Sequence, residues 1–256
     1  MKQLKILLVN ESGCFSPGIT KLARVLSGKH RVCIVGPTRS GHSLGHKLTA
    51  TKPLRAEQFF ALSRVKIFGV NGTPCDCVAL ALDKLLKTKP DLIITGIDQK
   101  SGQTIYSSGT VSAAIMGTIH GIPSIAVAAP VSNERDEKCF AGIVNAFVKN
   151  LGTLYKNMVK DVTLNVVVPT SAWGKKLQCT HLTVDRIDNS YTYEVNPFGR
   201  AFYWQNVDKM GPPLSSLDQK GDLYWQKRNY TTVTPLKYDL TCEDGLKSLE
   251  NSKFKL

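Results

Sequence analysis

The stretch KILLVNESGCFSPGI, Lys5 to Ile19, contains the pattern on which the fold prediction rests. After Lys5, the four residues Ile6–Val9 are a short aliphatic run, which predicts a buried β-strand over Lys5–Val9. The run stops abruptly at a polar tetrad, residues 10–13, that is too short to be a helix. A Pro-Gly pair then leads into apolar spacing that predicts a helix over Ile19–Leu26. The tetrad is therefore either a plain turn or the edge of a site.

The alternation of apolar strand and helix continues along the chain. Strands are predicted over Arg31–Val35, Lys66–Val70, Asp91–Thr95, Ile122–Ala128 and Val162–Val168, and helices over Cys77–Leu86, Gly109–His120 and Lys138–Met158. We expect Asp76 to cap the second helix. Near-continuous apolar strands separated by helices indicate a parallel sheet covered on both faces. The predicted class is α/β, a Rossmann-like, three-layer, doubly wound and mostly parallel sheet.

The character of the sequence changes after Pro169. Short β segments separated by Gly, Pro and Asn are predicted over 182–186, Tyr191–Val195, Ala201–Trp204 and Tyr230–Val233. We therefore expect an α/β core over residues 1–170 and a β-rich extension over residues 171–256 that returns to the core, the two forming one structural unit.

Composition limits the classes of function. The chain has 33 Lys and Arg against 20 Asp and Glu, a net charge of +13, which favours an anionic ligand. The basic residues are spread along the chain without a dense run, so specific nucleic-acid binding is not expected. No apolar run approaches the roughly 20 residues of a membrane span and no signal peptide is evident, so we expect no membrane and a cytoplasmic location. The seven loosely spaced cysteines are expected to be reduced and mostly buried.

Polar loops follow four of the predicted strands, and ligands of open α/β sheets bind at the carboxyl ends of strands. The loops are residues 10–13, Thr38–Ser43, Asn71–Pro74 and 96–98, the last followed by Ser107–Thr110. The Gly-rich dinucleotide and P-loop motifs and the Gly-x-Ser-x-Gly nucleophile motif are all missing from the sequence. Dinucleotide binding, P-loop nucleotide binding and a serine nucleophile of this type are therefore not expected in these loops.

The loops are rich in oxygen donors. Carboxylate and hydroxyl ligands of the kind that Mg²⁺ and Mn²⁺ prefer are Glu11, Ser12, Ser40 and Asp98. Ser108 and Thr110, with Gly109 between them, open a predicted helix whose N-terminus suits an anion. Each loop alone is a common turn or cap. Their coincidence at strand ends predicts metal-assisted phosphoryl chemistry.

Seven segments together match the motifs of one known family. They are NESGCFSPGI at 10–19, RSGHS at 39–43, GTPCDCV at 72–78, GID at 96–98, SSGTVSAAIMG at 107–117, NVVVP at 165–169 and TVTPLKYDLT at 232–241. In order and spacing the chain resembles the SurE family of metal-dependent nucleoside monophosphatases, the 5'/3'-nucleotidases. The resemblance implies hydrolysis of phosphomonoesters with Mg²⁺ or Mn²⁺ as the cofactor.

The resemblance also implies roles for individual residues. Carried over by position, the metal ligands are Glu11, Ser12, Ser40 and Asp98, the phosphate-binding residues are Ser108, Gly109 and Thr110, and the catalytic residues are Asn10, Glu11 and Ser12. Asn10 would orient the Glu11 loop. The family pattern has two aspartates at positions 11 and 12 and an asparagine at position 98. Both ligand sets carry two negative charges, because the acid lost at Ser12 is offset by Asp98, and we hypothesise a rearranged metal site.

Partners follow from the same resemblance. It implies that the substrates are nucleoside monophosphates or other small phosphomonoesters, with polyphosphate as a further substrate. It also implies a homodimer or homotetramer, in which the C-terminal extension is the oligomerisation arm. The alternative is a catalytically impaired SurE-like protein that binds nucleotide or phosphate without turnover. A nucleic-acid-binding protein is the third hypothesis, and it would need a charged stripe that the sequence does not show.

Overall fold

A computed structural model describes residues 2–41, 44–62, 65–99, 105–129, 137–169, 177–183, 191–205 and 217–251. The strands are β1 (Lys5–Val9), β2 (Arg31–Pro37), β3 (Ala56–Leu62), β4 (Val65–Val70), β5 (Leu92–Asp98), β6 (Ser124–Ala128), β7 (Val162–Val167), β8 (Leu177–Cys179), β9 (Tyr191–Val195), β10 (Ala201–Gln205) and β11 (Thr231–Lys237). The helices are α1 (Pro17–Leu26), α2 (Pro74–Leu80), α3 (Gly109–Ile119), α4 (Glu137–Lys156), α5 (Asp222–Gln226) and α6 (Glu243–Glu250), with a π-helical turn η1 (Ala81–Leu85).

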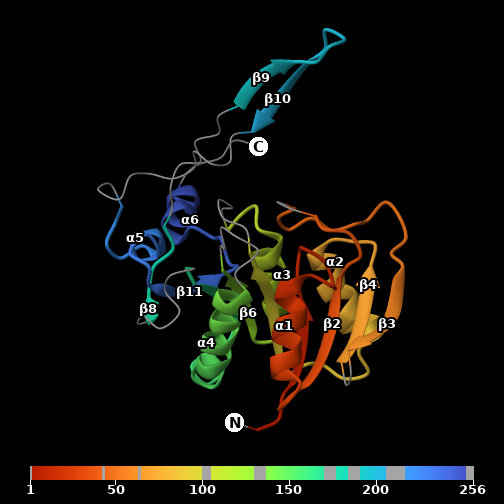
Figure 1. The fold of residues 1–256 in the computed structure, drawn as a ribbon. Helices are drawn as coiled ribbons and strands as arrows, with labels where there is room; N and C mark the ends of the chain where they lie inside the picture. Colours follow the sequence, from red (N-terminus) through yellow and green to blue (C-terminus); the bar gives the residue numbers. More distant parts are fainter. Residues whose placement is uncertain are drawn as a thin grey trace.

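One large sheet forms the middle layer, with the strand order β3-β4-β2-β1-β5-β6-β7-β11-β8. The strands from β4 to β7 are all parallel to their neighbours, whereas β3 is antiparallel to β4 and β11 is antiparallel to β7. Helices cover both faces of this sheet, as Figure 1 shows. The predicted α/β class with a mostly parallel sheet is confirmed.

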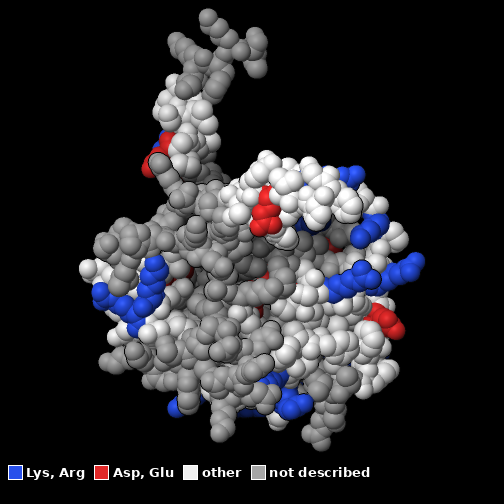
Figure 2. Space-filling view, turned by 45° about the horizontal axis from the view of Figure 1, so that its top comes forward, with Lys and Arg blue, Asp and Glu red and all other residues white. Residues whose placement is uncertain are grey.

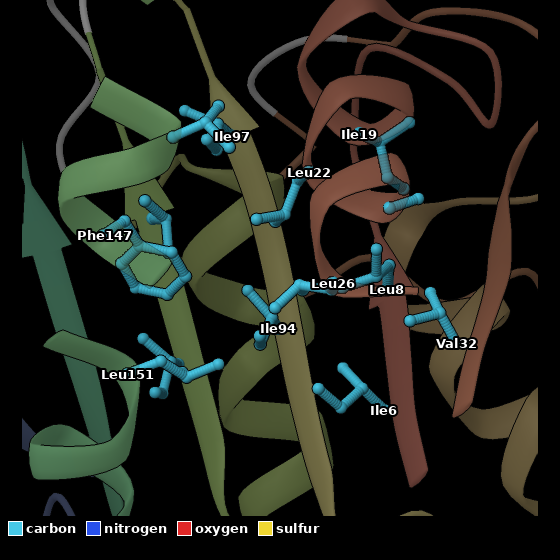
Figure 3. Packing of buried hydrophobic residues seen from close by; sticks show 14 of the residues in the cluster. Ile6, Leu8, Ile19, Leu22, Leu26, Val32, Ile94, Ile97, Phe147 and Leu151 are labelled. Atoms are coloured by element: carbon cyan, nitrogen blue, oxygen red, sulfur yellow. The ribbon is translucent and has the colours of Figure 1, made fainter. Parts of the chain in front are cut away.

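The two helical layers pack on aliphatic residues of the sheet. In Figure 3, Leu22 and Leu26 of α1 and Phe147 of α4 lie against β1 and β5, around Ile94. A second cluster on the other face joins α2, η1 and α3 to the sheet. Each buried aliphatic side chain contributes about 1.5–3 kcal/mol to the free energy of unfolding. The central strands are therefore rigid supports for the loops at their ends.

The second helix begins earlier than predicted. Pro74 occupies its first turn, where a residue without an N–H is tolerated, and Thr73 is the cap. The Thr73 hydroxyl accepts a hydrogen bond from Asp76 N (3.1 Å), and the Asp76 carboxylate accepts one from Thr73 N (2.8 Å). The prediction that Asp76 caps the helix is therefore wrong, because Asp76 is the third helical residue of a reciprocal capping box.

Other boundaries also differ from the sequence prediction. Strand β5 continues to Asp98, and β11 continues to Lys237 because it pairs along the whole of β7. Strands β3 and β8 and helices α5 and α6 were not predicted. Of the β segment predicted over 182–186, residues 182 and 183 are not in a strand, and the remainder lies outside the described residues.

Strands β9 and β10 form a separate antiparallel hairpin that projects away from the main sheet (Figure 1). Its side chains are largely exposed, and the rings of Tyr193 and Tyr203 pack against each other with centroids 5.4 Å apart. In Figure 2 the Lys and Arg side chains of the described residues lie in separate groups, so this face has no continuous basic stripe among them.

Two expectations from composition can be compared with the described part of the chain. None of its helices is both long enough and apolar enough to span a membrane. Of its cysteines, Cys14, Cys75 and Cys77 are buried, Cys33 is half-buried, and Cys179 and Cys242 are exposed. Burial raises the pKa of the Cys75 thiol to about 12, which makes it an unreactive core residue.

Candidate active site

Asn10 holds the turn that follows β1. Its amide nitrogen donates hydrogen bonds to the carbonyl oxygen of Ile97 (3.2 Å) and to the hydroxyl oxygen of Ser16 (3.0 Å). Its amide oxygen accepts one from the backbone N–H of Ser12 (2.9 Å). Asn10 thus ties the end of β1 to the end of β5 and to the start of α1. Both ends of its amide are used for this, so Asn10 fixes the position of this turn.

Glu11 lies against the first turn of α3. Its side chain is fully buried, and a Cβ atom built on Gly109 would lie 2.6 Å from Glu11 Oε2. The same Cβ would lie 3.2 Å from Cγ of Pro74, at the start of α2. A helix N-terminus is a favourable place for a carboxylate. Because Gly109 has no side chain, there is room for the Glu11 carboxylate at this position.

Asp98 is the last residue of β5 and is 3% exposed. Its carbonyl oxygen accepts a hydrogen bond from the backbone N–H of Ala129 (2.7 Å). Because β1 and β5 are neighbouring parallel strands, with Val9 opposite Thr95, their carboxyl ends lie side by side. The structure therefore brings the loops of two buried acids, Glu11 and Asp98, to one edge of the sheet.

The other two predicted metal ligands lie at the same edge. Ser12 is half-buried in the turn after β1, and Ser40 is exposed. The residue after Ser40, Gly41, donates a backbone hydrogen bond to the carbonyl oxygen of Glu11 (3.2 Å). The described residues contain no group of three or more His, Cys, Asp or Glu side chains placed to share a metal. The four predicted ligands at this edge are thus two carboxylates and two hydroxyls.

The start of α3 contains the predicted phosphate-binding residues. Ser108 is the cap, and its hydroxyl oxygen accepts a hydrogen bond from Val111 N (3.2 Å). Thr110 is fixed through its carbonyl oxygen, which accepts a hydrogen bond from the Thr95 hydroxyl on β5 (2.7 Å). The Thr110 hydroxyl is different. It is buried, the residue being 2% exposed, and no group in the described part of the chain is a hydrogen-bond partner for it.

The loop that follows β2, of which the sequence analysis assigned only Thr38–Ser43 to the site, continues across this edge. After Gly41, its next anchor is Gly45, whose backbone N–H donates to the carbonyl oxygen of Ser107 (3.0 Å). Further along is Thr49, whose backbone N–H (2.9 Å) and hydroxyl (2.6 Å) both donate to the Asp76 carboxylate. The loop therefore joins the Glu11 turn, the start of α3 and the start of α2.

Asp76 is consequently a structural acid. Burial alone would raise its pKa, but the hydrogen bonds from Thr49 and Thr73 outweigh burial, and the pKa of Asp76 is lowered. The motif GTPCDCV indicated that this segment matters, but nothing in it identified Thr49, which is 27 residues away, as the partner.

The fold and the candidate site define a class of protein: a three-layer α/β protein with buried acids and a helix N-terminus at the carboxyl edge of its sheet. The family model described as survival protein SurE matches residues 6–189. The chain belongs to the SurE family, so the resemblance found in the sequence is confirmed.

Similar proteins extend this result over nearly the full length. The chain is 35% identical over 244 residues to the 5'-nucleotidase SurE of Thermoanaerobacter sp. (strain X514), covering 93% of this chain and 94% of that protein. It is 35% identical over 258 residues to the 5'-nucleotidase SurE of Cyanothece sp. (strain PCC 7425), covering 96% and 95%. The crystal structure of the SurE protein from Aquifex aeolicus superposes with a TM-score of 0.78 at 33% identity, covering 96% of this chain and 100% of that one.

Proposed function

We propose that this protein is a metal-dependent phosphomonoesterase that hydrolyses nucleoside monophosphates, a 5'/3'-nucleotidase. Its relatives named 5'-nucleotidase SurE support a nucleotidase or phosphatase function. The observation that carries the proposal is the buried Thr110 hydroxyl, which has no partner among the described residues and belongs to the first turn of α3, against which Glu11 packs. A phosphate oxygen would satisfy that hydroxyl.

The donor set fits a hard divalent cation. The carboxylates of Glu11 and Asp98, with the hydroxyls of Ser12 and Ser40, offer only oxygen ligands, as Mg²⁺ and Mn²⁺ prefer. When bound, such a cation polarises a phosphoryl oxygen and lowers the pKa of a coordinated water. We propose these four residues as its ligands.

The remaining residues hold the substrate and the site. The Thr110 hydroxyl and the first backbone N–H groups of α3 would donate hydrogen bonds to the phosphate, and the helix dipole would favour its charge. The hydroxyl oxygen of Ser108 already accepts a capping bond, but its O–H can still donate to the phosphate. Asn10 would keep the Glu11 turn in place.

We further propose that residues 1–170 are the catalytic core and residues 171–256 an extension that belongs to the same structural unit. Two observations support this: β8 and β11 of the extension add to the main sheet beside β7, whereas the β9–β10 hairpin leaves it. The exposed aromatic side chains of this hairpin are suited to contact a second copy, giving a homodimer or homotetramer.

Phosphate release is the direct test. The protein, supplied with Mn²⁺ or Mg²⁺, should hydrolyse p-nitrophenyl phosphate and nucleoside monophosphates. Thr110→Val should lower turnover at least about tenfold, because the variant cannot donate a hydrogen bond to the phosphate. Thr118→Val, in the same helix but bonded to Thr163, is the matched control and should remain active.

The alternative is a protein that binds nucleotide or phosphate without turnover, and the observation in its favour is Ser12, a hydroxyl where the family pattern has an acid. Calorimetric binding of AMP without phosphate release under any of these metals would support it. If the protein neither binds AMP nor releases phosphate, both proposals are contradicted.

A further inference from the structure

A cavity of about 520 Å³ lies at the opposite edge of the sheet from the candidate active site. It is lined by the amino ends of β1, β2 and β4, by the turn after α1 and by the segment that follows η1. In Figure 1 this edge is the one near the N-terminus. Its volume is within the range of roughly 300–1,000 Å³ that is typical of small-molecule sites.

The lining of this cavity is strongly basic. It includes four cationic residues, Lys5, Arg31, Lys66 and Lys87, and no Asp or Glu. The carboxylate of the adjacent Asp91 is outside the lining and accepts a hydrogen bond from the backbone N–H of Lys5 (2.7 Å).

The sheet register concentrates three of these charges. Lys5 is opposite Arg31, and Lys66 is opposite Cys33. Because Arg31 and Cys33 are two residues apart on β2, the side chains of Lys5, Arg31 and Lys66 project from one face of the sheet. Like charges on neighbouring strands destabilise a sheet. A bound anion would remove that repulsion.

A buried histidine adds a neutral donor to the lining. His30 Nδ1 accepts a hydrogen bond from the backbone N–H of Leu4 (3.2 Å), which leaves the ring proton on Nε2. Burial, together with the charges of Lys29 and the N-terminal amine, lowers the pKa of His30 and keeps the ring neutral. Apolar side chains on the same face, Cys33 and Leu86 among them, complete the wall.

From this geometry we propose that the cavity binds a small polyphosphate anion of the nucleoside triphosphate class, at a site separate from the candidate active site. Four cations without an acid in the lining match a ligand with three or more negative charges. The guanidinium of Arg31 suits two phosphate oxygens at once, and the lysines act as point charges. The apolar wall would contact the nucleoside. The inference does not depend on the proposed phosphatase function.

Isothermal titration of the full-length protein with ATP and, separately, with inorganic tripolyphosphate tests this proposal. The cavity variant is Arg31→Glu/Lys66→Glu. Its matched control is Lys156→Glu/Lys160→Glu, two exposed lysines outside the lining with the same change in net charge. We expect the cavity variant to bind ATP at least about tenfold more weakly, and the control to stay within about twofold of the unmodified protein.

Three outcomes would overturn the site: no binding of either anion to the unmodified protein at millimolar concentration, equal weakening in both variants, or full affinity in the cavity variant. Tighter binding of ATP than of tripolyphosphate would assign a contact to the nucleoside, whereas equal binding would assign the site to the phosphates alone; both support it. If circular dichroism shows that the charge-reversed cavity variant does not fold, Arg31→Gln/Lys66→Gln and its control Lys156→Gln/Lys160→Gln make the same comparison.

Discussion

At the scale of single residues, the candidate site is shaped by a residue without a side chain. Gly109 begins α3, and the space where its Cβ would be is taken by the carboxylate of Glu11. Sequence patterns placed Gly109 at the start of a helix, but they could not show that a buried acid from another strand end fills the gap. That contact depends on tertiary packing between segments almost 100 residues apart.

Gly109→Ala should therefore damage the site more than a usual exchange of glycine for alanine in a helix. The new methyl group must displace Glu11 or shift α3, which should lower the free energy of unfolding by about 1–3 kcal/mol and lower phosphatase activity. Urea unfolding and a p-nitrophenyl phosphate assay measure the two effects. Gly28→Ala is the control, because its Cβ would be 3.5 Å from the nearest atom, an ordinary contact. Equal stability of the two variants would contradict the prediction.

A substitution at Asp98 tests the hypothesis of a rearranged metal site, in which Asp98 replaces the acid lost at Ser12. Asp98→Asn leaves Glu11 as the one acid of the four proposed ligands, so we expect Mn²⁺ affinity to fall at least about tenfold in a calorimetric titration. Asp83→Asn removes an exposed acid on η1 and should leave the affinity unchanged. Undiminished Mn²⁺ binding by Asp98→Asn would refute the rearranged site.

At the scale of elements, the sequence was informative wherever a strand is buried on both faces. The aliphatic runs of β1, β2, β4, β5, β6 and β7 are local signals, and the rule that ligands bind at the carboxyl ends of such strands located the candidate site. Strands β3 and β8 were missed because β3 pairs on one side only and β8 has three residues. Likewise, no local pattern joins Thr49 to Asp76.

The contact between Thr49, in the loop between β2 and β3, and Asp76 of α2 should depend on pH. Since the pKa of Asp76 is lowered in the folded protein, its ionised carboxylate stabilises the fold above the ordinary value of 3.8, and this contribution is lost as the pH falls through and below that value. Asp76→Asn should lower the free energy of unfolding at pH 7 by about 1–3 kcal/mol, with a smaller difference from the unmodified protein near pH 4 and below. Urea titrations across this range measure it. Asp83→Asn is the control for the removal of an exposed acid, and a constant difference for Asp76→Asn would contradict the prediction.

At the scale of the whole molecule, the main sheet and the β9–β10 hairpin differ in how they are stabilised. The sheet is covered by helices, whereas Tyr203 and Trp204 of the hairpin are 65% and 62% exposed. The sequence predicted both strands of the hairpin as short β segments separated by Gly, Pro and Asn. It could not predict that they leave the sheet, because the same residues would suit an internal strand.

If the hairpin contacts a second copy, charges on it should break the oligomer. We expect the unmodified protein to have the mass of a dimer or tetramer by light scattering, and Tyr193→Glu/Tyr203→Glu to have a smaller one. Phe60→Glu, a change at an exposed aromatic residue of β3, is the control and should keep the original mass. A monomeric unmodified protein, or a double variant of unchanged mass, would contradict this role of the hairpin.

The loop between β2 and β3 has a consequence for how this protein can vary. Three of its anchors, Gly41, Gly45 and Thr49, follow one another at intervals of four residues, and each is bonded to a different segment around the candidate site. Insertions are tolerated where few backbone hydrogen bonds are at stake, and here the anchors depend on them. Adding or removing a residue between these anchors would pull at least one of them from its partner. The length of this loop is therefore as much a part of the site as the residues in it.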